Sequence, residues 1–321
     1  MSKAAMVWLI VAAALVFLSM IFFVITMSVN DWDFTKLSTF NYETNEHEIR
    51  DSFVNISVKT DTADIQFIPY DGGNCKVVCC ENSKTKHDVY VKEGTLTVQV
   101  TDDRKWYDYI GIQWGKSKIT VYLPETVYAS LYIKESTGNI DIPQTFSFDS
   151  IDIATSTGDV KNAASASGDV KISTSTGNIH LNNITAGSLT LSVTTGNVTA
   201  SNIACVGDLS IRVSTGKTNL ANVSCANLLS TGSTGDITLK NVVASEKLSV
   251  ERSTGDVKFD SSDASEIFVE TDTGDVAGTL LSDKVFIVQT DTGKIDVPKT
   301  ITGGRCEVTT DTGDIKIGIT G

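Results

Sequence analysis

Three aspartates, Asp272, Asp291 and Asp311, occupy the same place in a recurring Asp-Thr-Gly motif, 19 and 20 residues apart. Earlier copies of the motif carry Ser or Thr at this place. If the copies stack as neighbouring strands, the carboxylates lie about 5 Å apart and repel one another unless solvent or a cation relieves the charge. Ca²⁺ prefers such oxygen ligands, so the three aspartates are candidate calcium ligands. The Gly-Gly-x-Gly-x-Asp calcium repeat is absent, however, and Lys294 partly neutralises the row.

The histidines and the remaining acidic residues show no recognisable catalytic set. His47, His87 and His180 lie far apart in the sequence, and His180 falls at a repeat position that other copies fill with Lys or Thr. This pattern is typical of surface histidines and supports no nucleophile–histidine–acid triad. A solenoid enzyme that cleaves polysaccharide needs clustered carboxylates in one groove, whereas the aspartates here recur with the repeat. We therefore assign no catalytic residue and no cofactor.

The cysteines raise the question of disulfides, because the chain contains six of them: Cys75, Cys79, Cys80, Cys205, Cys225 and Cys306. Cys205 and Cys225 align with alanines of other copies, which places them in a small inward column and predicts buried thiols. The first three share one strand-like segment, and their Cys-x3-Cys-Cys spacing matches no common zinc site. Pairing of Cys75 with either neighbour stays open, and Cys306 has no evident partner.

Four aromatic residues, Trp106, Tyr107, Tyr109 and Trp114, fall within nine positions of an insertion that spans 101–117. Such a loop could fold over the open end of a repeat array, whose strand edges and apolar columns need cover, and we favour this interpretation. Alternatively, exposed rings form a platform for sugars or a partner protein, since Trp and Tyr dominate binding hot spots.

Internal repetition defines the elements that position these residues. Glycines of a Ser/Thr-Thr-Gly or Asp-Thr-Gly motif recur every 19 or 20 residues, at Gly138, Gly158, Gly177, Gly196, Gly216, Gly235, Gly255, Gly274, Gly293 and Gly313. A fixed period near 20 is the mark of a stacked array in which each unit buries its apolar face against its neighbours. A corner between two strands needs positive φ, which glycine adopts without steric cost. We interpret the ten glycines as structural corners.

Polar residues near these glycines are expected to cap the corners. Asn or Asp follows eight of the ten glycines, and its side chain can bond turn amides. A second series is expected to do the same at the opposite corner, and consists of Asn183, Asn202, Asn222 and Asn241.

Each repeat alternates in polarity after its glycine. The second and fourth residues are mostly apolar, as at Ile237 and Leu239, whereas the third is polar and variable. This period of two predicts a strand with one buried face, and a second strand follows halfway, as at 189–193. The fold class is therefore all-β, a parallel β-solenoid of about 19–20 residues per turn. We expect a right-handed β-helix from the crossover rule.

The chain divides into five parts by composition and period. Residues 138–321 carry the regular repeats, and 50–137 are expected to form degenerate first turns. Residues 4–29 contain no charge and exceed the roughly 20 residues that a transmembrane helix needs. A signal peptide would have a shorter apolar region and a small-residue cleavage site, so we favour an uncleaved anchor. The remaining parts are a juxtamembrane linker at 30–49 and the N-terminal residues 1–3.

Charge sets the orientation and excludes one class of partner. Lys3 precedes the apolar segment whereas Asp31 and Asp33 follow it, so the positive-inside bias places residues 1–3 in the cytoplasm and the solenoid outside. Beyond Val29 there are 25 basic and 39 acidic residues, a net charge of −14. Nucleic acid is not expected as a partner, because phosphate binding relies on clustered Lys and Arg.

The repeats, from Glu135-Ser-Thr-Gly-Asn-Ile140 to Asp311-Thr-Gly-Asp-Ile315, together with the anchor, resemble a bacterial "putative adhesin" domain family of unknown function that includes LiaG-like membrane proteins. The resemblance covers about residues 50–321. It implies a solenoid on the outer side of the cell membrane and a role in adhesion or the envelope-stress response, and it supplies no catalytic residues.

These patterns lead to one functional prediction and one alternative. We predict a non-catalytic, membrane-anchored surface or cell-envelope module whose partners are an envelope polysaccharide or a surface protein. The alternative is a carbohydrate-active β-helix enzyme, which clustered acid and base residues in one groove would favour.

Overall fold

The computed structural model describes residues 2–33, 42–102 and 116–320 of the chain. Helix α1 (Lys3–Val29) begins after Ser2, whose hydroxyl accepts a hydrogen bond from the Ala5 N–H at 3.3 Å. Two hydroxyls inside the helix, those of Ser19 and Thr26, donate to carbonyl oxygens of the preceding turn. By its length and composition α1 is long and apolar enough to cross a bilayer, and these hydroxyls bring no unsatisfied donor into it.

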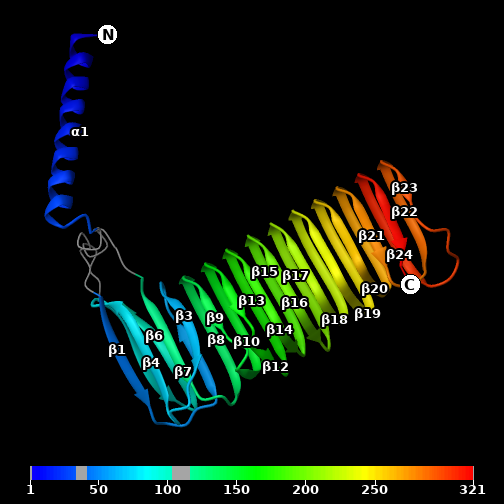
Figure 1. Cartoon of the computed structure of the whole chain (residues 1–321), viewed down its shortest axis with the longest axis horizontal. Coiled ribbons are helices and arrows are strands. Elements are labelled where there is room, and N and C mark those ends of the chain that lie inside the picture. Colours follow the sequence, from blue (N-terminus) through cyan, green and yellow to red (C-terminus); the bar gives the residue numbers. More distant parts are fainter. Residues whose placement is uncertain (1, 34–41, 103–115, 321) are drawn as a thin grey trace.

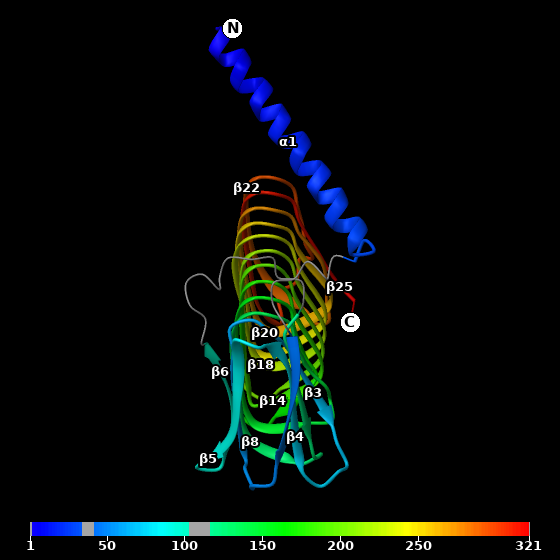
Figure 2. The same cartoon turned by 90° about the vertical axis from the view of Figure 1, so that its left-hand side faces the viewer.

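The other described residues contain 25 strands that coil into a β-solenoid of about 10 turns (Figures 1 and 2). Neighbouring turns pair in parallel and in register, so that Val198 lies beside Thr218 and Thr218 beside Ile237. The predicted all-β parallel solenoid is confirmed. The hand of the coil stays a prediction.

Each turn contributes one strand to each of two faces. In spatial order, the first face begins with β1 (Tyr42–Ile49), β4 (Cys75–Asn82), β7 (Lys118–Leu123), β3 (Asp64–Pro69), β9 (Ile140–Ile142), β11 (Val160–Asn162), β14 (Ile179–Ala186) and β16 (Val198–Cys205). The second begins with β5 (Thr85–Lys92), β6 (Thr95–Asp102), β2 (Asn55–Lys59), β8 (Val127–Thr137), β10 (Ser147–Thr157), β13 (Asp169–Thr176), β15 (Ser188–Thr195) and β17 (Asp208–Thr215). The short β12 (Ser165–Ala166) pairs with the start of β10.

Three long strands then run through both faces. They are β18 (Thr218–Thr234), β19 (Ile237–Thr254) and β20 (Val257–Thr273). The first face ends with β21 (Val276–Leu280), β25 (Ile315–Ile319) and β23 (Ile295–Asp296), and the second ends with β24 (Gly304–Thr312) and β22 (Lys284–Thr292).

Stacked glycines form one corner of the coil. Nine of the ten predicted corner glycines have φ between 127° and 157°, and the exception, Gly293, lies in the outermost turn. Close approach is a second reason for glycine. A Cβ atom on Gly235 would lie 2.0 Å from the carbonyl oxygen of Gly216 in the adjacent turn. A side chain anywhere along this column would therefore push neighbouring turns apart.

The predicted polar caps join neighbouring turns rather than closing their own corners. The side-chain oxygen of Asn178 accepts a hydrogen bond from the backbone N–H of Asn197 at 3.0 Å, and the same contact recurs along the stack. At the second corner, four asparagines have φ between 50° and 56°, and the side-chain amide of each of the last three donates to the side-chain oxygen of the preceding one at 2.9 or 3.0 Å. These four are Asn183, Asn202, Asn222 and Asn241.

The inward columns form one continuous apolar core. The predicted positions after the corner glycines are buried from Ile140 to Ile315, which confirms the register. The exceptions lie in the outermost turn, which has a neighbour on one side only: Ile295 is 48% exposed and Val297 is half-buried.

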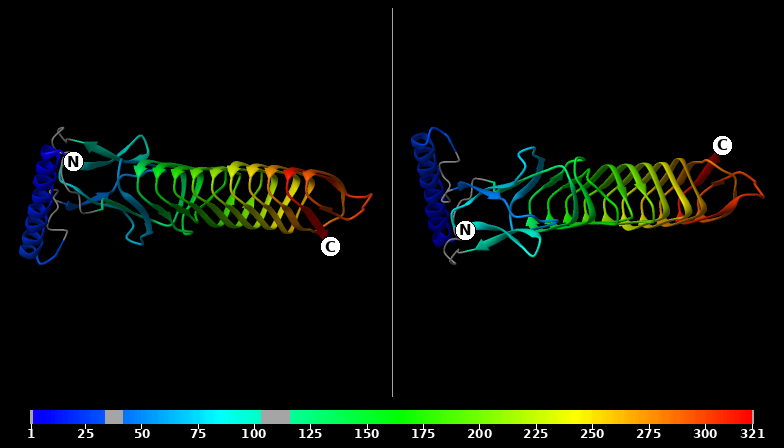
Figure 3. Two further views of the ribbon diagram at one scale, coloured as in Figure 1. Left: turned by 90° about the horizontal axis from the view of Figure 1, so that it is seen from above. Right: turned by 90° about the horizontal axis from the view of Figure 1, so that it is seen from below.

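Both ends of the stack depart from the sequence order of the turns. Strand β24, red in Figure 1, lies between β20 and β22, and β25 lies between β21 and β23. At the other end β2 lies between β6 and β8. The loop after β23 passes beyond the last turn before the chain returns (Figure 3). The first and last turns of the chain are therefore paired on both sides, so neither frays without breaking two ladders.

The prediction of a linker at 30–49 is wrong for residues 42–49. These residues form β1, which pairs antiparallel with β4, and β4 pairs antiparallel with β7. On the other face β5 covers β6, also in antiparallel pairing. An open end of a parallel stack exposes unpaired backbone groups, and these strands cover that edge. Within 50–137, β2, β3, β6 and β7 are true solenoid strands, whereas β4 and β5 belong to the covering layer.

Candidate binding groove and polar clusters

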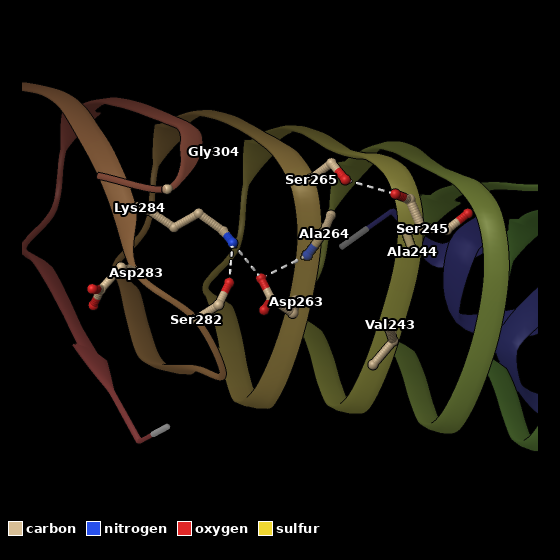
Figure 4. A pocket seen from close by; sticks show the side chains of 11 residues that line it. Val243, Ala244, Ser245, Asp263, Ala264, Ser265, Ser282, Asp283, Lys284 and Gly304 are labelled. Atoms are coloured by element: carbon tan, nitrogen blue, oxygen red, sulfur yellow. Dashed lines mark hydrogen bonds and ion pairs between the residues drawn. The ribbon is translucent and has the colours of Figure 1, made fainter. Parts of the chain in front are cut away.

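A groove of about 580 Å³ opens at one corner of the last turns (Figure 4). Strands β19 and β20 pass this corner with small side chains, and the chain then leaves the regular path after β21 and returns at Gly304. A Cβ atom at Gly304 would lie 1.8 Å from the Ser265 carbonyl oxygen, so glycine is needed where the returning chain meets β20. The lining residues are Val243, Ala244, Ser245, Asp263, Ala264, Ser265, Ser282, Asp283, Lys284, Gly303 and Gly304.

A buried ion pair forms part of the groove wall. Lys284 is 2% exposed, and its Nζ lies 2.6 Å from Asp263 Oδ1 and donates to Ser282 Oγ at 2.6 Å (Figure 4). The same Asp263 oxygen accepts from the Ala264 N–H at 2.9 Å. The carboxylate and the hydrogen bonds offset the cost of burying the ammonium group.

The Ser282–Lys284 contact resembles the pairing of a hydroxyl with a lysine base. In such a pair the neutral amine must accept the hydroxyl proton. Here Lys284 Nζ donates to Ser282 Oγ and forms an ion pair with Asp263, which is not the arrangement of a base that accepts the hydroxyl proton. The arrangement therefore holds the groove wall in place and does not activate a nucleophile.

The rest of the groove presents hydrogen-bonding groups to solvent. Ser245, Ser265 and Asp283 are exposed, and the Ser265 hydroxyl donates to the Ser245 carbonyl at 2.7 Å. Hydroxyls and a carboxylate beside small apolar side chains suit a polar ligand that carries both donors and acceptors.

The three candidate calcium ligands line up, but not in sequence order. Asp311 lies between Asp272 and Asp291, because Thr310 pairs with both Thr271 and Thr290. All three carboxylates are exposed. Binding of Ca²⁺ to them stays a prediction.

The surface prediction holds for His180, which is exposed, and is wrong for His87. His87 is 5% exposed, with Nε2 2.8 Å from Thr60 Oγ1 and Nδ1 2.6 Å from Glu81 Oε2. This hydroxyl–imidazole–carboxylate order is that of a triad, but Thr60 is itself only 5% exposed, so a substrate has no access to its hydroxyl. His47 is half-buried.

The cysteines are free thiols, and all except Cys80 are buried. The prediction of buried thiols at Cys205 and Cys225 is confirmed, and burial raises the pKa of both, that of Cys225 to about 12. Burial likewise raises the pKa of Cys75 and Cys306 to about 12.

A charged residue lies inside the regular core. Arg252 is 4% exposed, and its Nη2 donates to Thr218 Oγ1 at 3.2 Å and to Ser230 Oγ at 3.0 Å. Its Nε and Nη1 have no hydrogen-bond partner among the described residues. A Cβ atom on Gly232 would lie 1.9 Å from Nη1, so glycine makes room for the guanidinium group. Burial lowers the pKa of Arg252.

The predicted aromatic platform, Trp106, Tyr107, Tyr109 and Trp114, lies outside the described residues. Sequence reasoning missed Lys284, Arg252 and Glu81. For Arg252 a signal existed, since it stands at an inward position that most other repeats fill with Val or Thr. For Lys284 there was none, because the two preceding repeats carry the exposed Glu246 and Ser265 at its position. For Glu81 there was none, because β4 belongs to the irregular covering layer.

The fold and these sites define a repetitive β-solenoid domain. The family model described as Toastrack DUF4097 matches residues 53–231 and 205–321, so the chain belongs to this family. A search of curated proteins found no match.

Several solved structures are similar to the chain at low sequence identity. A "putative adhesin" from Parabacteroides merdae ATCC 43184 is 13% identical, with a TM-score of 0.46 over 88% of this chain and 98% of that one. A "putative adhesin" from Bacteroides fragilis NCTC 9343 is 13% identical, with a TM-score of 0.39 over 87% and 97%. A "putative lipid binding protein" from Parabacteroides distasonis ATCC 8503 is 17% identical, with a TM-score of 0.40 over 74% and 95%.

Proposed function

We propose that this chain is a single-pass membrane protein whose solenoid stands outside the cytoplasm and binds a cell-envelope polysaccharide without cleaving it. The groove carries this proposal. It lies at the end of the stack opposite β1, the strand that follows the helix in the chain, so the turns between act as a rigid spacer. A module that reaches into the envelope needs its binding surface at this far end.

The groove chemistry supports a glycan as the ligand. Sugar hydroxyls both donate and accept hydrogen bonds, and the groove offers serine hydroxyls, the Asp283 carboxylate and backbone carbonyls. Of its two aspartates, Asp263 is held by Lys284, which leaves one free carboxylate where glycoside cleavage uses a pair. Binding without catalysis follows from this arrangement.

A bulky substitution tests the groove. The full-length protein in detergent is incubated with soluble cell-wall polysaccharide fragments, and the bound fraction is compared between the wild type and Ser265→Trp. Tryptophan at this exposed position fills the groove, so binding should fall. Val206→Trp is the matched control, since Val206 is 85% exposed at a corner earlier in the stack. Equal binding by both variants, or none by the wild type, would contradict the proposal.

Orientation is tested separately. Protease added to intact, wall-stripped cells should digest the solenoid, because Lys3 precedes α1 whereas Asp31 and Asp33 follow it. Protection of the C-terminal domain would overturn the assignment.

A further inference from the structure

Three metal-ligating side chains meet at the other end of the solenoid, far from the groove. Cys79 and Glu81 are two residues apart on β4, so both point to the inner face of that strand. The β4–β5 hairpin, joined by the Asn82–Thr85 pair, brings His87 beside them. The Cys79 thiol, a Glu81 carboxylate oxygen and a His87 ring nitrogen all lie within 4.8 Å of one another. The three residues are at most 5% exposed.

The neighbours of this cluster orient it as they would for a bound ion. Asn45 Nδ2 donates to Glu81 Oε1 at 2.7 Å, so the other carboxylate oxygen, Oε2, faces the imidazole. Thr60 Oγ1 lies 2.8 Å from His87 Nε2 and engages that nitrogen, whereas Nδ1 faces Glu81 Oε2 at 2.6 Å. Metal-binding histidines almost always have their second nitrogen engaged in this way, and ligating carboxylates are hydrogen-bonded too.

The ligand types select the metal. A thiolate and an imidazole are poor ligands for Ca²⁺ or Mg²⁺, whereas a sulfur, nitrogen and oxygen set is typical of Zn²⁺. One thiolate and one carboxylate would balance the charge of a divalent ion, as a buried site requires. We propose that Cys79, Glu81 and His87 bind a divalent transition-metal ion, with zinc as the physiological occupant.

The position of the cluster gives the ion a structural role. Its three ligands come from β4 and β5 of the covering layer, and their hydrogen-bond partners Asn45 and Thr60 come from β1 and from the segment after β2 in the first turn. An ion would hold β4 to β5, and the contact of His87 with Thr60 would connect this pair to the first turn. Metal binding would then add to the stability of this end.

Cobalt tests the site directly, because Co²⁺ bound by a thiolate shows a sulfur-to-metal charge-transfer absorption band. Purified full-length protein in detergent is stripped with a chelator and titrated with Co²⁺ and then Zn²⁺. The wild type should develop the band with one equivalent of Co²⁺, lose it on addition of Zn²⁺, and melt at a higher temperature with Zn²⁺ than without.

Three variants distinguish a metal site from a cluster that is held by hydrogen bonds alone. The hydrogen bonds within the cluster join Asn45 to Glu81, Glu81 to His87 and His87 to Thr60. Cys79→Ala keeps all of them, so the variant should fold and lack the band. Cys225→Ala is the control, as it removes a buried thiol where other repeats carry alanine, and should keep the band. Thr60→Val should weaken Co²⁺ binding about 10–100-fold. A wild type that binds no Co²⁺, or a band that survives in Cys79→Ala, would overturn the proposal and leave a hydrogen-bonded cluster alone.

Discussion

Glu135 is a buried carboxyl group that should make the stability of the first turns depend on pH. It lies at an inward position of β8, is 4% exposed, and stands directly opposite Thr155 of the adjacent turn. Neither of its carboxyl oxygens has a well-formed hydrogen bond among the described residues. Burial raises the pKa of Glu135 from 4.5 to about 7, with the nearby Thr155 hydroxyl acting against this and the Asp64 charge adding to it.

The sign follows from proton binding. In the unfolded chain Glu135 loses its proton above its ordinary pKa of 4.5, whereas in the folded chain it keeps the proton until about pH 7. The folded state therefore binds more protons between these values, and stability falls as the pH rises through this window. A pKa difference of one corresponds to about 1.4 kcal/mol, so the full loss is about 3 kcal/mol and is complete above pH 7.

Glu135→Gln isolates this effect, because glutamine has a similar shape and no charge. Compared with the wild type, the variant should be more stable by up to about 3 kcal/mol at pH 8 and nearly equal at pH 4.5. Urea denaturation of the full-length protein gives the overall shift, and hydrogen exchange of β8 and β10 amides locates it in the first turns.

An exposed glutamate provides the control. Glu251→Gln, on the outer side of β19, should keep the wild-type pH dependence. If Glu135→Gln loses stability between pH 4.5 and 7 as steeply as the wild type, the carboxyl group is not the cause and the reasoning fails.

Three further predictions concern the stack itself. Gly235→Val should destabilise the protein by at least about 1–3 kcal/mol, because a branched side chain at this position has positive φ and collides with a neighbouring carbonyl. Thr238→Val on the outer face should be nearly neutral. Equal urea midpoints for the two variants would contradict the register. Arg252→Met should raise the free energy of unfolding by about 1–4 kcal/mol, and with it the urea midpoint, since it removes a buried charge; a lower midpoint would mean that its hydrogen bonds to two hydroxyls outweigh the cost of burial. Deletion of 304–321 should expose β22 to limited proteolysis, because it removes an internal rung, whereas continued protection would mean that the turns stack in sequence order.

The repeating part of the molecule could be predicted because each turn contacts only its neighbours. The same local choices recur every 19 or 20 residues, so alignment alone placed the glycine corners, the inward columns, the asparagine series and the buried thiols at Cys205 and Cys225. The apolar segment that forms α1 was equally clear, since length and hydrophobicity define such a helix without reference to the rest of the fold.

Tertiary structure decided the parts of the molecule that depart from the repeat of 19 or 20 residues. Any turn presents the same backbone edge to its neighbour, so nothing in the repeat indicates that β24 enters between β20 and β22, or that β1 covers β4. The β24 pairings set the order of the aspartates and form the groove around Lys284, whereas the β4–β5 hairpin brings Cys79, Glu81 and His87 together. The sequence by itself determined the repeating solenoid, because its contacts are periodic; the ends and the candidate sites depend on contacts that occur once, between segments that no period relates.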